Sequence, residues 1–507
     1  MRRPRALRVA LTAGVALALT APGVAGAATG PAPGSPAYLA RDAQNIADAY
    51  GRQTAPDGQL TPAYGLANAQ HIGPAYEAQL LAQAATPTRP ALSPGMAVPG
   101  WNSGNPYRQS WNGHRGHITP VAFTGRYGEL LRGDVFTPMA GAHDPYTGAP
   151  LTGSFPGVVI TTGSVQGSEQ MYWWLAEDLA ERGYVVLTYD VQGQGTSETL
   201  PHQGTIADLP YCDLAAPPAP GEDSPCPGLP AQQTSNFVYG TEDAISFFLS
   251  TPAKRYPNPQ AGSAKVNAYN PQWRSFDRSP DLNTVTPGRT TRLALVGHSL
   301  GAVAVSYVQG VDKRVEAVVA LDKLTTSTAV AGSSPFTAQG ALKPVVPGLG
   351  VQSEYGFTVA PYFANPGLFS PGPPTSPTQA PDPEREEKTG FDGWKAAGVD
   401  SMVIVPRAST HLEYTDISYV LPASRYGQDV ASHYAQAWID KYVKHAPAAD
   451  SALLATSFSY LEPTSSGWHA VTLKRADRLS FYFCSGYDFG TASGRAVDDD
   501  IAGVGCP

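Results

Sequence analysis

One stretch constrains the fold more than any other part of the sequence, residues 291–310, which read TRLALVGHSLGAVAVSYVQG. Residues 293–296 are apolar and short enough for a buried strand, and the small and apolar residues 302–308 suit a packed helix. Between them lies the pentapeptide Gly-His-Ser-Leu-Gly, centred on Ser299. Glycines two residues to either side of a serine let the strand and helix backbones approach closely. The stretch therefore predicts an α/β fold in which a sharp turn holds the Ser299 hydroxyl clear of a sheet.

A chance G-x-S-x-G is the alternative explanation, since the chain contains 52 glycines. The surrounding strand–turn–helix pattern favours a functional turn instead. A helix that begins just after Ser299 would also direct free N–H groups and a partial positive charge at this point. We therefore predict that Ser299 is a nucleophile and that the N–H of Leu300 stabilises a negative oxygen formed beside it.

A serine nucleophile needs a base, and the base needs an orienting acid. In folds with this turn, serine, acid and histidine follow one another along the chain at strand ends. His411 comes directly after the strand expected over residues 401–405, and is the predicted base. Glu354 ends the strand expected over residues 343–354, and is the predicted acid. Asp322 ends the strand one earlier in the chain, and is the alternative acid.

Residues 155–190 form a second informative stretch. The stretch begins with an apolar run at 157–161, followed by a glycine-bounded turn and a helical pattern at 170–182. A second apolar run follows at 184–189. This order indicates a right-handed βαβ crossover. The turn reads GSVQGS, from 163 to 168. We expect it to supply the second N–H of an oxyanion hole, with Val165 as donor and Ser164 or Gln166 as alternatives.

The N-terminal residues predict a targeting segment. Four arginines lie within the first eight residues, an apolar run follows at 9–21, and Ala-Gly-Ala occupies 25–27. This order is typical of a secretory signal peptide, here 1–27. The apolar run is too short to cross a membrane, which takes about 20 residues, and no later stretch approaches that length. We expect a secreted, extracellular protein without an integral membrane segment.

The charge and cysteine content narrow the functional classes. The formal net charge is −8, and removal of four arginines with the signal peptide makes it more negative. This balance argues against nucleic acid as a partner. The four cysteines fall into two local pairs, Cys212/Cys226 and Cys484/Cys506, although three connectivities are possible. No C-x-x-C or H-E-x-x-H motif occurs, and we expect neither a metal nor another cofactor.

The chain divides into four regions by pattern. After the signal peptide comes an N-terminal extension, 28–100, in which residues 38–50 suit a helix. The principal domain spans 101–445 and contains two cap-like insertions, at 199–235 and 252–290. Residues 446–507 contain two strand-like runs, at 470–474 and 479–484, and are expected to form a small C-terminal appendage.

The motifs GSVQGS, DVQGQGTS, GHSLG, QSEYG and STHLEY occur in that order between about 120 and 445. In this respect the chain resembles the α/β-hydrolase superfamily, and within it secreted actinobacterial-type serine hydrolases of the dienelactone-hydrolase/cutinase-like kind. The resemblance implies a mostly parallel, doubly wound sheet, with Ser299 as nucleophile, His411 as base and Glu354 as acid. It also implies Val165 and Leu300 as oxyanion donors. The predicted acid is a glutamate, whereas aspartate is commoner at this place, so Asp322 remains the alternative acid. The insertions are also longer than those of a compact cutinase.

These features together predict a secreted serine hydrolase that cleaves carboxylic esters through an acyl-enzyme on Ser299. The expected substrate is a small-molecule or polymeric ester, and we expect a monomer. A lipase or polyester hydrolase, and a serine peptidase or amidase, would use the same residues. A non-catalytic binding module on the same scaffold is a further alternative. The identity of the substrate depends on loops whose shape the sequence does not determine.

Overall fold

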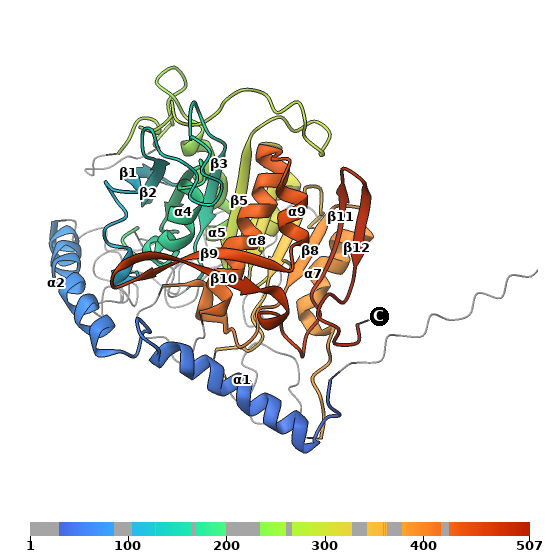
Figure 1. Cartoon of the computed structure of the whole chain (residues 1–507). Coiled ribbons are helices and arrows are strands. Elements are labelled where there is room, and N and C mark those ends of the chain that lie inside the picture. The colour runs from blue at the N-terminus through green and yellow to red at the C-terminus, as the bar shows by residue number, and fades with distance from the viewer. Residues whose placement is uncertain are drawn as a thin grey trace, which may run out of the picture.

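The computed structural model describes residues 30–85, 104–126, 128–164, 168–198, 234–259, 266–326, 342–357, 359, 361, 378–416 and 425–506. The predicted signal peptide, Val165, the Cys212/Cys226 pair and nearly all of the 199–235 insertion lie outside the described residues. The described residues form a mixed α/β structure built on one large, mostly parallel sheet with helices on both faces (Figure 1).

The large sheet has ten strands in the order β1-β2-β4-β3-β5-β6-β7-β8-β11-β12. The six central strands, from β4 to β8, pair in parallel, while β1, β2, β11 and β12 pair antiparallel at the two sides. The strand bounds are β1 Gly116–Thr124, β2 Leu130–Pro138, β3 Gly157–Thr161, β4 Val185–Tyr189, β5 Leu293–His298, β6 Ala317–Leu321, β7 Gly348–Val351, β8 Ser401–Ile404, β11 Gly486–Thr491 and β12 Gly494–Asp498.

Both faces of the central strands are buried. In β3, Val158 and Ile160 belong to one apolar cluster and Val159 belongs to the other, as expected when successive side chains alternate across a sheet. Helices α4 (Trp173–Ala180) and α8 (Tyr426–Ile439) contribute to the first cluster. Helices α5 (Thr234–Phe248), α6 (Leu300–Val311) and α7 (Arg385–Ala396) contribute to the second. Two-sided burial is why these strands read as continuous apolar runs in the sequence.

The N-terminal extension forms two helices, α1 (Pro36–Thr54) and α2 (Pro62–Ala85), so the helix expected over 38–50 is confirmed. The side chain of Ser35 caps α1 by accepting the Tyr38 N–H at 3.2 Å, and a proline follows at the first helical position. In Figure 1, α1 runs along the lower edge of the molecule, below the sheet. Within the described ranges, no helix combines the length and the apolar character that a membrane crossing requires.

The C-terminal residues extend the large sheet, which the sequence did not predict. Strands β9 (Ser457–Thr464) and β10 (Gly467–Lys474) form a separate two-stranded sheet, next to the short helix α9 (Ala449–Leu454). Strands β11 and β12 instead continue the main sheet beyond β8. The strand expected over 479–484 is wrong, because this segment makes only an isolated bridge at Leu479 before β11 begins. A disulfide joins Cys484 to Cys506, as one of the two expected local pairs.

The described part of the insertion at 252–290 contacts both β3 and β1. Phe276 in this insertion pairs with Phe155 and packs against Phe248. A side chain on Gly157, the first residue of β3, would collide with Phe248 and Phe276. The Phe276 part of this insertion therefore lies at the amino end of β3, whereas residues 256–258 bind the backbone of Thr124 at the end of β1. That the insertion forms a cap stays a prediction.

Candidate active site

Ser299 occupies a sharp turn between β5 and α6. Its backbone angles, φ 55° and ψ −120°, are rare for a residue with a side chain, and holding them costs about 1–3 kcal/mol. The positions two residues before and two residues after Ser299 have no room for a side chain. A Cβ on Gly297 would lie 2.1 Å from the Gly301 carbonyl oxygen, and one on Gly301 would lie 2.4 Å from the Thr161 carbonyl oxygen. The predicted strand–turn–helix is confirmed, and the surrounding packing maintains the strain at Ser299.

Ser299, His411 and Asp322 form a hydrogen-bonded chain. His411 Nε2 lies 3.1 Å from Ser299 Oγ, and His411 Nδ1 lies 2.6 Å from Asp322 Oδ2. Ser299 follows β5, Asp322 follows β6, and His411 begins the short helix η4 (His411–Tyr414) after β8. All three therefore lie at the carboxyl ends of parallel strands, where the loops of such a sheet converge.

The strand register explains why Asp322 reaches His411. His298 is paired with Leu321 across β5 and β6, so Ser299 and Asp322 leave the sheet side by side. Burial would raise the pKa of Asp322, but hydrogen bonds from His411 and Ser353 outweigh it and lower the pKa well below its usual range. Ser353 contributes its N–H at 3.1 Å and its hydroxyl at 2.7 Å. An ionised Asp322 holds the proton of His411 on Nδ1, which leaves Nε2 free to accept the proton of Ser299.

The structure places Glu354 elsewhere, so the prediction that Glu354 orients His411 is corrected. Leu321, the residue before Asp322, is paired with Val351, which comes three residues before Glu354. Glu354 therefore lies further from the end of its strand than Asp322 does. Its fully buried carboxylate accepts hydrogen bonds from the Ala408 N–H at 2.7 Å and from the Asn45 side chain on α1 at 2.5 Å. Burial raises the pKa of Glu354 to about 6, although these hydrogen bonds partly offset it. Glu354 thus joins α1 to the segment that precedes His411.

His298 has a supporting position behind Ser299. Its Nε2 lies 2.9 Å from the His411 carbonyl oxygen, which can only accept, so Nε2 carries the proton. Nδ1 then accepts the Tyr172 hydroxyl at 2.7 Å, and that hydroxyl accepts the Gly163 N–H at 2.9 Å. Burial lowers the pKa of His298 to about 3, so the ring stays neutral. The His298 ring is buried, and its two hydrogen bonds connect the loop after β3 with the backbone of His411.

Two features favour negative charge beside Ser299. Leu300 is the first residue of α6, and N–H groups in the first turn of a helix have no partner within the helix. The loop after β3 passes directly beside the serine, since a Cβ on Gly163 would lie 3.2 Å from Ser299 Cβ. Val165, two residues further on, lies outside the described residues, and its N–H stays a prediction.

The sequence did not reveal the role of Tyr172. It lies in the short helix η2 (Glu169–Tyr172), nine residues after Gly163, where an aromatic residue is as typical of a core as of a site. Within the described ranges, no three His, Cys, Asp or Glu side chains are grouped so that they could hold a metal ion.

No protein-family model matches the chain, and no curated protein matches it.

Proposed function

We propose that this protein is a serine hydrolase with the α/β-hydrolase fold, and that it cleaves carboxylic esters through an acyl-enzyme on Ser299. The observation that carries the proposal is the hydrogen-bonded chain from Asp322 through His411 to Ser299. Its members follow the order serine, acid, histidine along the chain, each after a parallel strand. The strained turn at Ser299, immediately before a helix, supports the same conclusion.

The proposed mechanism follows from the two hydrogen bonds of His411. His411 Nε2 takes the Ser299 proton as Oγ attacks the ester carbonyl, and the imidazolium formed is stabilised by Asp322. The carbonyl oxygen becomes negative, and the Leu300 N–H and the loop after β3 are placed to stabilise it. His411 then donates its proton to the leaving alcohol. Water, activated by the same ring, hydrolyses the acyl-enzyme and restores Ser299.

An ester is the proposed substrate class because it makes the smaller demand on this arrangement. In both reactions His411 donates the proton to the leaving group. An amine is a poorer leaving group than an alcohol, so an amide depends more strongly on this proton transfer and an ester is the easier substrate.

Fluorophosphonate labelling tests the proposal directly. The full chain is treated with a fluorophosphonate probe, and hydrolysis of p-nitrophenyl butyrate is measured in parallel. We expect covalent labelling and ester hydrolysis that are both lost in Ser299→Ala. Ser466→Ala is the matched control, since this serine is exposed on the β9–β10 turn, and it is expected to behave as wild type. Unchanged labelling of a folded Ser299→Ala, or none of the folded wild type, would refute the proposal.

Export is part of the proposal. The predicted signal peptide and the disulfide between Cys484 and Cys506 both fit an oxidising compartment outside the cytoplasm. Expression with and without residues 1–27, followed by assay of the culture medium, tests it: the export proposal predicts that only the longer form is released.

A further inference from the structure

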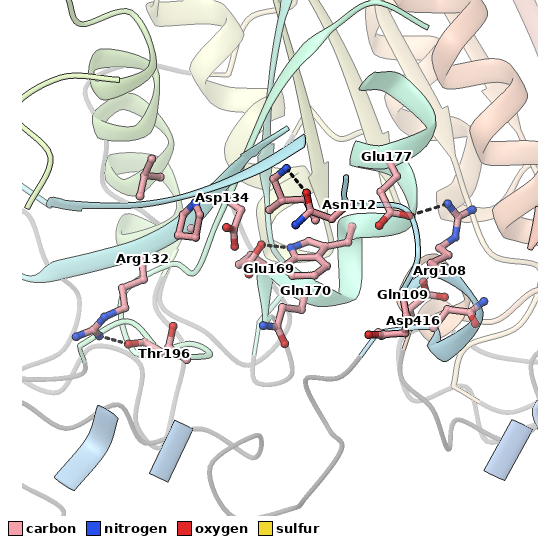
Figure 2. Close-up of a pocket in the computed structure, with 17 residues that line it drawn as sticks. Arg108, Gln109, Asn112, Arg132, Asp134, Glu169, Gln170, Glu177, Thr196 and Asp416 are labelled. Atoms are coloured by element: carbon pink, nitrogen blue, oxygen red, sulfur yellow. Dashed lines mark hydrogen bonds and ion pairs between the residues drawn. The ribbon is translucent and has the colours of Figure 1, made fainter. Parts of the chain in front are cut away.

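A cavity lies next to η2, the short helix that also contains Tyr172. Its volume is about 560 Å³, and it lies between β2, η2 and the short helix η1 (Pro106–Arg108). In Figure 2, the side chains of Asp134, Glu169 and Gln170 gather in the middle, with Arg132 to one side and Arg108 to the other. Trp173, at the start of α4, completes this part of the wall. A space of this size accommodates an organic molecule rather than a single ion.

Two carboxyl groups face each other in this cavity. Asp134 on β2 and Glu169 on η2 both line it and lie close enough to interact electrostatically (Figure 2). Glu169 also accepts hydrogen bonds from the Trp173 indole N–H at 2.5 Å and from the Thr188 hydroxyl at 2.6 Å. Burial raises the pKa of both carboxyl groups, and their proximity raises that of Glu169 further. Both effects disfavour two negative charges side by side at this position.

The two arginines that line the cavity bind partners other than Asp134 and Glu169. Arg108 pairs with Glu177 at 3.1 Å and with Asp178 at 3.0 Å, both on α4. Arg132 donates to the Thr196 carbonyl oxygen. In the part of the chain that the structure describes, no lysine or arginine forms an ion pair with Asp134 or Glu169. Asp190 lies behind the pair, where one of its oxygens accepts the Glu169 N–H at 2.7 Å, and it adds a further negative group.

We propose that this cavity binds a small organic cation, whose ammonium or guanidinium group lies against Asp134 and Glu169 and whose apolar part lies against Trp173. Such a group supplies a positive charge between the two carboxylates that line the cavity. The half-buried indole ring of Trp173 offers a surface that attracts a cation and its methylene groups. A neutral polyol would leave the two carboxylates uncompensated. The proposal is independent of the chemistry at Ser299.

Calorimetry with a matched pair of ligands tests the cation site. The full chain is titrated with putrescine and with 1,4-butanediol, which has the same carbon chain but carries no charge. We expect one putrescine to bind per chain and the diol not to bind. Asp134→Asn is expected to weaken putrescine binding at least about tenfold, because a buried charge partner is lost. Glu169→Gln is expected to do the same and gives a second, independent variant.

The control variant is Asp392→Asn, which removes one negative charge on α7, outside this cavity. It is expected to bind putrescine as wild type does, which separates a built site from general attraction to an acidic surface. Equal binding of the diol, absence of putrescine binding at millimolar concentration, or equal losses in Asp392→Asn and Asp134→Asn would each overturn the proposal. None of these outcomes depends on ester hydrolysis, so the cation site and the proposed hydrolase activity are tested independently of each other.

Discussion

At the scale of single residues, the choice between two carboxylates is the most informative result. Both Asp322 and Glu354 follow an apolar strand; Glu354 is fully buried and Asp322 is half-buried. The residue next to Ser299 across the sheet is Asp322, and its short side chain meets His411 Nδ1 at 2.6 Å. Glu354 is turned toward α1, and its carboxylate accepts hydrogen bonds from Asn45 on α1 and from the Ala408 N–H.

The two carboxylates therefore predict different outcomes on substitution. Asp322→Asn should lower kcat by about 10³- to 10⁴-fold, because an amide favours the wrong tautomer of the histidine. Glu354→Gln keeps the shape of the side chain away from the reacting atoms and should alter kcat by less than about tenfold. Steady-state hydrolysis of p-nitrophenyl butyrate by both variants provides the measurement. A larger loss in Glu354→Gln than in Asp322→Asn would contradict the assignment of the acid.

At the scale of elements, α1 is joined to the body by polar contacts as well as by packing. Asn45 donates to Glu354 and accepts the Arg407 guanidinium N–H at 2.8 Å. Arg52 pairs with Asp429 at 3.3 Å on α8 and with Glu462 at 2.9 Å on β9. These contacts connect α1 with the segments before and after His411. The N-terminal extension is thus an integral part of the structure around the candidate site.

We expect Asn45→Ala to lower the free energy of unfolding by about 1–3 kcal/mol, because it removes a partner from the buried carboxylate of Glu354. Gln44→Ala is the matched control on the same helix, since Gln44 makes only an exposed contact with Asp48, and it should change stability by less than about 0.5 kcal/mol. Urea unfolding followed by circular dichroism measures both. Equal stability of the two variants would show that the Asn45 contact contributes little.

At the scale of the whole molecule, the C-terminal residues close one side of the sheet. β11 pairs with β8, β12 follows it, and the disulfide between Cys484 and Cys506 joins the segment before β11 to the end of the described chain. Both cysteines are buried. The disulfide therefore restrains the two outermost strands of the sheet as one closed loop.

Replacing both Cys484 and Cys506 by serine should lower stability by about 3 kcal/mol, since the bond closes a loop with a sequence separation of 22 residues and limits the unfolded chain. The expected result is a lower midpoint of urea unfolding, with ester hydrolysis at low temperature retained. Ser299 lies on the other side of the parallel strands β6, β7 and β8 from this loop. An unchanged midpoint would mean that the packing of β11 and β12 is sufficient by itself.

Elements with local sequence signals could be predicted before the structure was known. The apolar run, the two glycines and the small residues around Ser299 specify strand, turn and helix within about 20 residues, because each acts on its immediate neighbours. The same reasoning located His411, since it follows a short apolar strand late in the chain. The sequence also led to the parallel βαβ arrangement, because strands buried on both faces read as continuous apolar runs.

Contacts between residues far apart in the chain could not be predicted in this way. Strand register placed Asp322 rather than Glu354 beside His411, and register depends on pairing between strands far apart in the chain. The hydroxyl of Tyr172 and the amide of Asn45 acquired their partners in the same way, as did the carboxyl pair of Asp134 and Glu169. No local pattern encodes these contacts, because each depends on the packing of separate elements, which sets the distance between two side chains.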